Sequence, residues 1–201
     1  MAYVLNGRYY DYRGIAACVD FLIPMAYSMT GKGRGGQALQ PNSPLPAVKS
    51  GLVNYQRLGV NAKQLVLALP WYGYDVPCVD HAPAPCKIAP GSWDSTTFQV
   101  GYGSVIGKLL PEAGGRSALR WNQSAASPYF DYMYMYLGGA VRHRVVFDDP
   151  RSIRAKVAMA EVLGVRGIGV WTANAVPYAT DPAAAAEMWA AVKANGTSRA
   201  V

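Results

Sequence analysis

The sequence predicts an α/β fold in which buried strands alternate with helices. Three segments have the residues that typically begin and end a helix, with Pro near the start and Gly beyond the end. Three short apolar runs are interspersed with them. Near-continuous hydrophobicity is typical of strands buried on both faces, as in parallel sheets. Helices that alternate with such strands indicate βα units with crossover connections.

Each predicted helix begins at a Ser-Pro or Asp-Pro dipeptide. The polar residue is expected to cap the helix, Pro fits its first turn, and Gly fits the position beyond its end. The helices run from Ser43 to Gly59, from Asp149 to Gly164 and from Asp181 to Gly196. Apolar side chains recur at helical spacing in all three: Leu45, Val48, Leu52 and Tyr55; Ile153, Val157 and Ala160; Ala185, Met188, Trp189 and Val192.

The predicted strands are residues 21–27, 65–71 and 168–171. Pro24 stands inside the first run, where it has no N–H to donate to a neighbouring strand. We therefore expect this strand to be irregular.

A long stretch separates Trp71 from the helix at Pro150, and it exceeds a plain loop between a strand and a helix. Within it, residues 129–136 are rich in Tyr and favour a strand over a helix. Gly138-Gly139 then predicts a turn into residues 142–147, so the stretch contains a β-hairpin. Its aromatic stripe could stack on sugars, but we favour packing of the hairpin against the rest of the fold.

Composition narrows the classes of partner. Of the 201 residues, 51% are hydrophobic and 15% are charged, which is typical of a globular domain. No apolar run approaches the roughly 20 residues that span a bilayer, and residues 1–6 do not resemble a signal peptide, so no membrane partner is expected. The net charge of +7 is scattered without a basic stripe or a nucleic-acid-binding motif, so no nucleic-acid partner is expected.

The chain has three cysteines. Cys78 and Cys86 flank a short Pro-rich segment, and we predict a disulfide between them, while Cys18 beside an apolar run is predicted to be a buried thiol. The alternative is a zinc site formed by Cys78, His81 and Cys86. That set lacks a clear fourth ligand, so no metal is expected.

Two N-x-S/T sequons make Asn122 and Asn195 candidate glycosylation sites. Together with the predicted disulfide, they favour a lysosomal, vacuolar or secreted location.

The carboxyl ends of the predicted strands resemble those of the family 18 glycoside hydrolases. Residues 21–27 read Phe-Leu-Ile-Pro-Met-Ala-Tyr, which is similar to that family's sixth barrel strand and its Met-x-Tyr-Asp ending. Residues 69–75 read Leu-Pro-Trp-Tyr-Gly-Tyr-Asp, similar to the seventh-strand pattern Pro-x-Tyr-Gly, and residues 167–171 end in Trp, as the eighth strand does. Each motif alone is weak, but three in this order are specific.

The resemblance covers nearly the whole chain. Further segments resemble the chitobiose-cleaving members of the family: residues 8–12, 70–75 with Cys78, 127–132, 148–152 and 166–174.

The resemblance implies that the chain forms part of a (β/α)8 TIM barrel. An eight-stranded barrel needs about 250 residues, so residues 1–201 are expected to supply the carboxyl-terminal part, about strands six to eight. The hairpin-containing subdomain, residues 75–147, would be inserted between strands seven and eight. The missing amino-terminal half of the barrel is an expected partner.

The resemblance also implies hydrolysis of GlcNAc-β1,4-GlcNAc linkages, in chitin or N-glycan core oligosaccharides, by a retaining, substrate-assisted mechanism without a cofactor. Tyr27 would orient the acetamido group of the substrate, and Trp171 would form the floor under the sugar. The remaining residues expected to line the substrate pocket are Met25, Ser28, Trp71 and Tyr72.

The chain departs from the family at two points. It has no Asp-x-x-Asp-x-Asp-x-Glu motif, and its glutamates fall on predicted outer helices or in the insertion: Glu112, Glu161 and Glu187. Asp75 follows a strand but is not expected to replace the missing acid. Ser28 stands where the family has Asp. We therefore expect the isolated chain to be inactive, and the alternative function is that of a catalytically inactive, chitinase-like sugar-binding protein.

Overall fold

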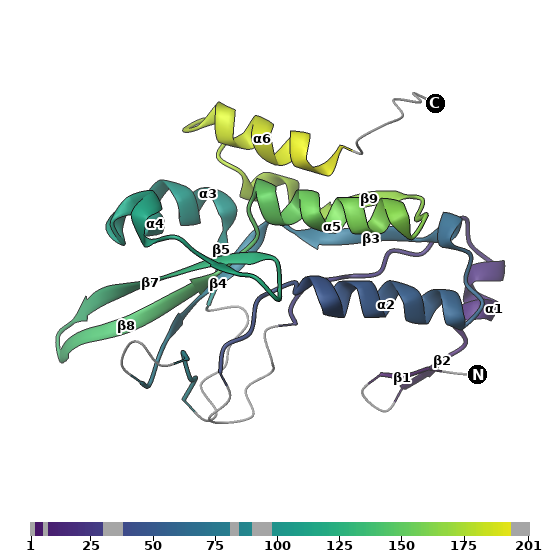
Figure 1. Ribbon diagram of the computed structural model, residues 1–201, viewed down its shortest axis with the longest axis horizontal. Helices are drawn as coiled ribbons and strands as arrows, with labels where there is room; N and C mark the ends of the chain where they lie inside the picture. Colours follow the sequence, from purple (N-terminus) through teal and green to yellow (C-terminus); the bar gives the residue numbers. More distant parts are fainter. Residues whose placement is uncertain (1–2, 6–7, 30–37, 81–84, 90–97, 194–201) are drawn as a thin grey trace.

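The computed structural model describes residues 3–5, 8–29, 38–80, 85–89 and 98–193 (Figure 1). Two structural units share one chain. A layer of parallel strands is covered by helices, and an antiparallel sheet extends from one end of that layer. No helix among the described residues is both long and apolar enough to cross a membrane.

The parallel layer is centred on β3 (Val66–Pro70). Strand β9 (Gly167–Trp171) pairs with β3 along its whole length, so that Pro70 lies opposite Trp171. Residues 21–27 lie along the other edge of β3 in parallel orientation. Only isolated bridges form there, Leu22 with Leu65 and Met25 with Ala68. The expected irregularity at Pro24 is confirmed, and its carbonyl still accepts from the N–H of Ala68 at 3.0 Å.

Three helices cover one face of this layer: α2 (Leu45–Arg57), α5 (Pro150–Val162) and α6 (Pro182–Val192). Helix α5 contacts both of the others. Asp149 and Ser152 form a reciprocal capping box at the start of α5, and the side chain of Asp181 accepts from the N–H of Ala184 at 2.9 Å to cap α6. The predicted caps of these two helices are therefore confirmed.

The predicted cap of α2 is wrong. Pro44 occupies the N-cap position, and Ser43 instead donates its hydroxyl to the carbonyl oxygen of Ala26 at 2.6 Å. Ser43 is fully buried, so its hydroxyl needs a partner, and this bond ties the start of α2 to the first extended segment. Gly59 and Gly164 take positive φ beyond α2 and α5, as expected, whereas Gly196 lies outside the described residues.

The amino-terminal part consists of short elements. Strands β1 (Tyr3–Leu5) and β2 (Arg8–Tyr10) form a hairpin before α1 (Tyr12–Ala17), and the 3-10 turn η1 (Ala62–Gln64) precedes β3. The prediction that Cys18 is buried is wrong. Cys18 ends the six-residue helix α1, which buries only Ala16, and its thiol is free and exposed.

The antiparallel sheet has the strand order β5-β4-β8-β7-β6. Its strands are β4 (Tyr72–Pro77), β5 (Gln99–Gly101), β6 (Arg120–Asn122), β7 (Ser127–Tyr136) and β8 (Gly139–Val146). Strands β7 and β8 form a hairpin at the residues where the sequence predicts one, and Gly139 supports its turn with φ +121°.

Short helical segments link β5 to β6, two strands of this same sheet, and one further turn follows the parallel strand β9. Between β5 and β6 these are α3 (Tyr102–Ser104), the π-helical turn η2 (Val105–Leu109), α4 (Leu110–Glu112) and the 3-10 turn η3 (Gly115–Ala118). A further 3-10 turn, η4 (Ala173–Ala175), follows β9.

A buried ion pair joins the two units. Lys156 of α5 and Asp148, just beyond β8, are both inaccessible to solvent and contact each other through the ammonium group and Oδ1. Ser152 donates to the same carboxylate oxygen at 2.7 Å, and the ammonium group lies 3.5 Å from the hydroxyl of Ser127 on β7. The pair therefore fixes α5 against the hairpin.

We predict that Lys156→Met destabilises the fold by about 3–5 kcal/mol, because it leaves the carboxylate of Asp148 buried without a cation. Replacing both partners, in Lys156→Met with Asp148→Leu, should recover much of this loss. Urea unfolding of the single and double variants measures the difference, and equal destabilisation by both would contradict it.

Candidate functional site

Three aromatic side chains meet where the parallel layer ends. The rings of Tyr27 and Trp171 stack with centroids 6.5 Å apart and planes inclined by 25°, and Tyr72 approaches Tyr27 edge-on at 6.0 Å. We call these residues the aromatic cluster. They meet because residues 21–27, β3 and β9 run parallel as neighbours, so their carboxyl ends share one edge of the layer.

The cluster lies on the face of the layer that the helices leave uncovered. Side chains alternate along a strand, so Tyr27 shares the face of Met25, which is bridged to Ala68, and Trp171 shares the face of its partner Pro70. Trp171 is 53% exposed and Met25 is 69% exposed. The flat indole of Trp171 is thus presented to solvent beside the half-buried ring of Tyr27.

The expectation that Trp71 lines this pocket is wrong. Trp71 is fully buried in the core, and its ring packs edge-on against Trp189 of α6 with centroids 4.7 Å apart. Trp71 continues the alternation of Leu67 and Leu69, which face the helices, whereas Tyr72 faces the opposite way.

Ser28 connects the cluster to β4 through hydroxyl groups. Its Oγ lies 2.8 Å from the hydroxyl of Tyr72 and 3.0 Å from that of Tyr74. Ser28 has a positive φ of 58°, which directs the chain away from the strand direction at this point. Tyr74 was not predicted as part of the site, although its two-residue spacing from Tyr72 within a strand could have indicated it.

Asn42 is a second residue that sequence reasoning missed. Its side chain is completely buried, accepts from the N–H of Ser28 at 2.7 Å and donates to the carbonyl oxygen of Tyr72 at 3.0 Å. One amide therefore fixes the end of the first extended segment relative to β4. The neighbouring Ser43 makes the analogous bond to Ala26.

The phenols of the cluster are held in their protonated form. Burial raises the pKa of Tyr27, and burial raises the pKa of Tyr72 still further, against a smaller opposing effect of its hydrogen bond with Ser28. Both hydroxyls are therefore hydrogen-bond donors at neutral and acidic pH. The hydroxyl of Tyr72 is engaged by the neutral Ser28, so the site offers the indole of Trp171, the phenol of Tyr27 and the hydroxyl of Ser28, which suits an uncharged polyhydroxylated ligand.

Asp75 lies on the other face of β4. It accepts from the hydroxyl of Tyr132 at 2.6 Å and lies 2.9 Å from Nδ1 of His143, both in the hairpin. The exposed glutamates belong to α4, α5 and α6: Glu112, Glu161 and Glu187. Among the described residues, none of these four carboxylates bonds to a residue of the aromatic cluster.

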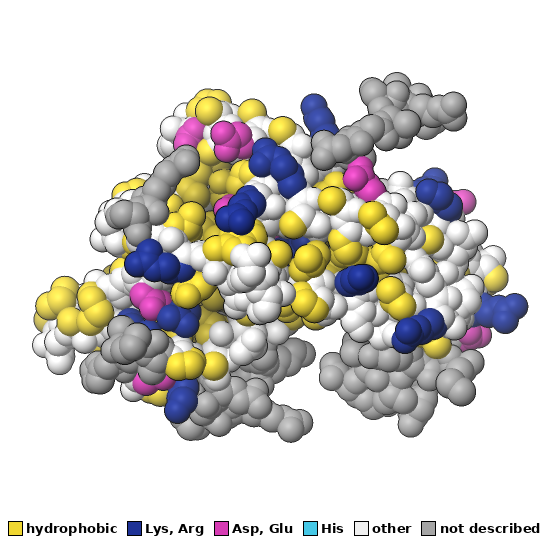
Figure 2. All heavy atoms as spheres, in the orientation of Figure 1, with side chains coloured by type: hydrophobic (Ala, Val, Ile, Leu, Met, Phe, Trp, Pro, Cys, Tyr) yellow, Lys and Arg dark blue, Asp and Glu magenta, His cyan; other side chains and the backbone are white. Residues whose placement is uncertain are grey.

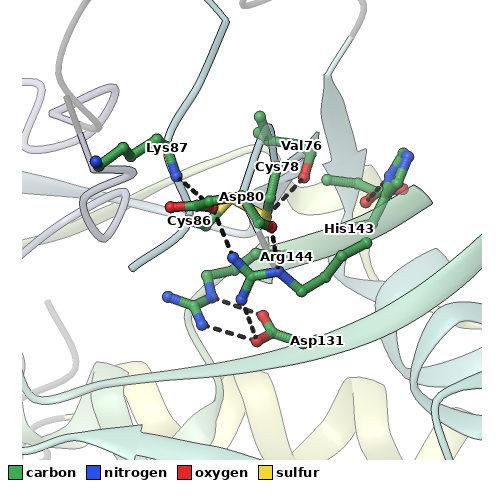
Figure 3. The surroundings of a disulfide bond; sticks show 10 residues. Val76, Cys78, Asp80, Cys86, Lys87, Asp131, His143 and Arg144 are labelled. Carbon is green, nitrogen blue, oxygen red and sulfur yellow. Dashed lines mark hydrogen bonds and ion pairs between the residues drawn. A yellow bond between two sulfur atoms is a disulfide. The ribbon is translucent and has the colours of Figure 1, made fainter. Parts of the chain in front are cut away.

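The predicted disulfide is present. Cys78 and Cys86 are bonded with Cα atoms 5.0 Å apart, so this pair of sulfurs does not form the alternative zinc site, and His81 lies outside the described residues. Figure 3 shows how the bridged loop holds Asp80 near β8. There the carboxylate of Asp80 accepts from Arg142 at 2.8 Å, so the loop is fastened to the hairpin.

The two sequons differ in what the structure shows. Asn122 ends β6, and its Oδ1 accepts from the hydroxyl of Ser124 and the N–H of Ala125. Asn195 lies outside the described residues. Glycosylation at both remains a prediction.

Comparison with known proteins gives consistent results along most of the chain. The profile of the family "Glycosyl hydrolases family 18" matches residues 2–175. The di-N-acetylchitobiase of Mus musculus is 35% identical over 201 residues, which cover 94% of this chain and 53% of that protein. The probable di-N-acetylchitobiase 1 of Dictyostelium discoideum is 32% identical, with coverage of 94% and 52%. The chain thus spans about half the length of these relatives.

Solved structures show the same fold. A class V chitinase from Nicotiana tobaccum in complex with NAG4 matches with a TM-score of 0.69 and 21% identity, over 92% of this chain and 53% of that one. The C-terminal domain of a putative chitinase from Desulfitobacterium hafniense matches with a TM-score of 0.66 and 25% identity, over 92% and 50%.

We predict that Asn42→Ala lowers the stability of the fold by about 1–3 kcal/mol, because it leaves the N–H of Ser28 and the carbonyl of Tyr72 without their partner. Asn54→Ala on α2 is a matched control, since no side-chain hydrogen bond of Asn54 is found in the described part of the chain. Thermal unfolding compares the two, and equal effects would show that the amide of Asn42 is dispensable.

Proposed function

This chain belongs to glycosyl hydrolase family 18, and on that premise we propose that it is the carboxyl-terminal part of a chitobiase-like hydrolase of GlcNAc-β1,4-GlcNAc linkages. The substrates we infer are chitin or N-glycan core oligosaccharides. The observation that carries the proposal is the stacked pair of Tyr27 and Trp171 at the carboxyl end of the parallel layer. Active sites of (β/α)8 barrels lie at this end of their strands.

We assign the 201 residues to about strands six to eight of the barrel, with the hairpin subdomain, residues 75–147, inserted between strands seven and eight. Residues 21–27, β3 and β9 would be those strands. The apolar side chains on the helix-free face support this assignment, since Phe21, Ile23 and Met25 are all exposed there. The missing half of the barrel would cover them.

The mechanism we propose is retaining and substrate-assisted. The acetamido oxygen of the substrate attacks its own anomeric carbon, and the bond to the leaving-group oxygen breaks as that oxygen gains a proton. Tyr27 would donate a hydrogen bond from its phenol to the acetamido oxygen and hold it in position; a phenol is protonated at neutral pH, and burial raises the pKa of this one further. Trp171 would support the apolar face of the sugar ring, with Met25, Ser28 and Tyr72 around it.

The proton donor for the leaving group is proposed to come from outside this chain. The 201 residues contain no Asp-x-x-Asp-x-Asp-x-Glu motif, and the three glutamates lie on exposed helical positions away from the cluster. Asp75 is engaged by Tyr132 and His143 on the other face of β4. Activity therefore needs the amino-terminal half of the barrel.

A second candidate function rests on Ser28. Where the family has Asp, this chain has a neutral hydroxyl that bonds to Tyr72 and Tyr74, so no negative charge supports a developing cation. Such a site can bind sugar without cleaving it. We also propose a lysosomal, vacuolar or secreted location, which the disulfide supports.

We predict that Trp171→Ala weakens the binding of chitobiose by about tenfold or more, because it removes the apolar surface against which the sugar packs. Tyr27→Phe keeps the ring and should lose only the contribution of the hydroxyl. Trp189→Ala on α6 is the matched control, and it should affect stability rather than affinity. Calorimetric titration with chitobiose distinguishes these variants, and unchanged affinity of Trp171→Ala would remove this residue from the site.

We predict that the isolated chain does not turn over a fluorogenic chitobioside, since a general acid contributes about 10²–10⁴-fold to such reactions. Co-expression with the amino-terminal half of the mouse relative should restore turnover. Sugar binding without restored turnover would favour the second candidate function. Turnover by the isolated chain that disappears in Asp75→Asn would instead identify Asp75 as the acid.

A further inference from the structure

The tip of the β7–β8 hairpin exposes a group of large apolar side chains. They are the consecutive residues Met133, Tyr134, Met135, Tyr136 and Leu137, which we call the hairpin tip. Figure 2 shows a hydrophobic patch at the left end of the molecule, where Figure 1 places the end of the β7–β8 hairpin. The exposure rises outward, from 7% at Tyr132 to 72% at Met135 and complete exposure at Leu137.

Both faces of the hairpin tip are apolar. Alternation along β7 places Met133 and Met135 on one face and Tyr134 and Tyr136 on the other, and Leu137 occupies the turn. No charged residue occurs in the sequence between Asp131 and Arg142. A protein partner that covered one face would leave the other exposed, whereas a medium that surrounds the tip would cover both.

The ribbon also projects beyond the rest of its sheet. Strand β6 pairs only with residues 127–129 of β7, and β4 pairs only with residues 143–146 of β8. Within the described residues, no other strand flanks the tip, and the turn at Leu137 is its outermost point. This geometry favours an approach in which a partner first contacts the turn at Leu137.

The tip does not have the geometry of a sugar platform. The rings of Tyr134 and Tyr136 are inclined by 55° to each other, so they offer no common plane to a pyranose ring. They also lie on the face of the sheet that carries His143, opposite to the face of Tyr72 and Tyr74. The hairpin tip is therefore separate from the aromatic cluster.

The base of the hairpin is held firmly. Asp131 accepts from Arg144 at 2.6 and 2.7 Å and from Arg142 at 3.2 Å, and Arg142 also bonds to Asp80 in the disulfide-bridged loop (Figure 3). The tip is thus presented on a rigid support. The chain as a whole has a net charge of +7, which complements an anionic surface.

We propose that the hairpin tip docks on anionic lipid membranes, with Leu137 entering first. Leu137 and Met135 would reach the acyl boundary, while Met133, which lies opposite Arg142, and the amphipathic rings of Tyr134 and Tyr136 would lie at the level of the headgroups. The positive net charge would draw the protein to anionic lipid. This revises the sequence-based expectation that the protein has no membrane partner, and it is independent of the hydrolase proposal.

The test is sedimentation of the purified chain with vesicles of phosphatidylcholine, with and without phosphatidylserine. The unmodified chain should bind the anionic vesicles, and Leu137→Glu should reduce the partition coefficient by about tenfold or more, because a charge replaces the leucine that would insert into the bilayer. Val162→Glu, at an exposed apolar residue on α5, is the matched control and should bind as the unmodified chain does. Circular dichroism confirms that each variant is folded.

Three results would overturn the proposal. These are no binding to either vesicle, equal loss with Leu137→Glu and Val162→Glu, and a dimer in sedimentation velocity that Leu137→Glu dissociates. The last result would show that a second copy of the chain covers the tip. Binding to the anionic vesicles that is lost only in Leu137→Glu supports docking on lipid.

Discussion

Trp71 is the point at which the two structural units are joined. Its N–H donates to the carbonyl oxygen of Trp171 at 2.7 Å, which closes the end of the parallel layer, and its carbonyl accepts from Tyr102, where the helical part of the insertion begins. Its indole is buried against Trp189 of the outer helix α6. Because successive side chains of an extended chain point to opposite faces, the next residue, Tyr72, enters the antiparallel sheet facing the opposite way. That change of face delivers Tyr72 to the aromatic cluster.

Buried polar groups fix the relative positions of the segments that form the site. Apolar packing of leucines tolerates small shifts, but a buried amide or hydroxyl must meet its partner within hydrogen-bonding distance. Asn42 and Ser43 satisfy this requirement between the first extended segment, α2 and β4. Lys156 and Oδ1 of Asp148 make the corresponding contact between α5 and the hairpin. The cost of leaving any of these groups unpaired restricts how the layers can slide past one another.

The chemistry of the site depends on uncharged hydroxyl groups that can donate hydrogen bonds. Tyr27 and Tyr72 keep their phenolic hydrogens because burial disfavours the phenolate, and Ser28 supplies a hydroxyl where a carboxylate would have brought charge. Asp75, which follows Tyr72 by three residues, points to the other face of β4 because side chains alternate along the strand. There its carboxylate contacts Tyr132 and His143 and holds the hairpin. In the function proposed for this chain, recognition of sugar and the supply of a proton are therefore separable tasks, and the described residues would serve the first.

The sequence alone determined the features that depend on near neighbours. Asp-Pro dipeptides start α5 and α6, Pro24 interrupts the first strand, Gly138-Gly139 turns the hairpin, and two cysteines eight residues apart form a disulfide. Only the tertiary structure decided which side chains meet over long separations. Ser28 bonds to Tyr72 and Tyr74 across 44 and 46 residues, Ser43 bonds to Ala26 instead of capping its own helix, and Trp71 faces the core instead of the pocket. Capping and turn formation are settled by a few adjacent dihedral angles. The face that a residue presents depends instead on how whole strands and helices pack, and no local pattern contains that information.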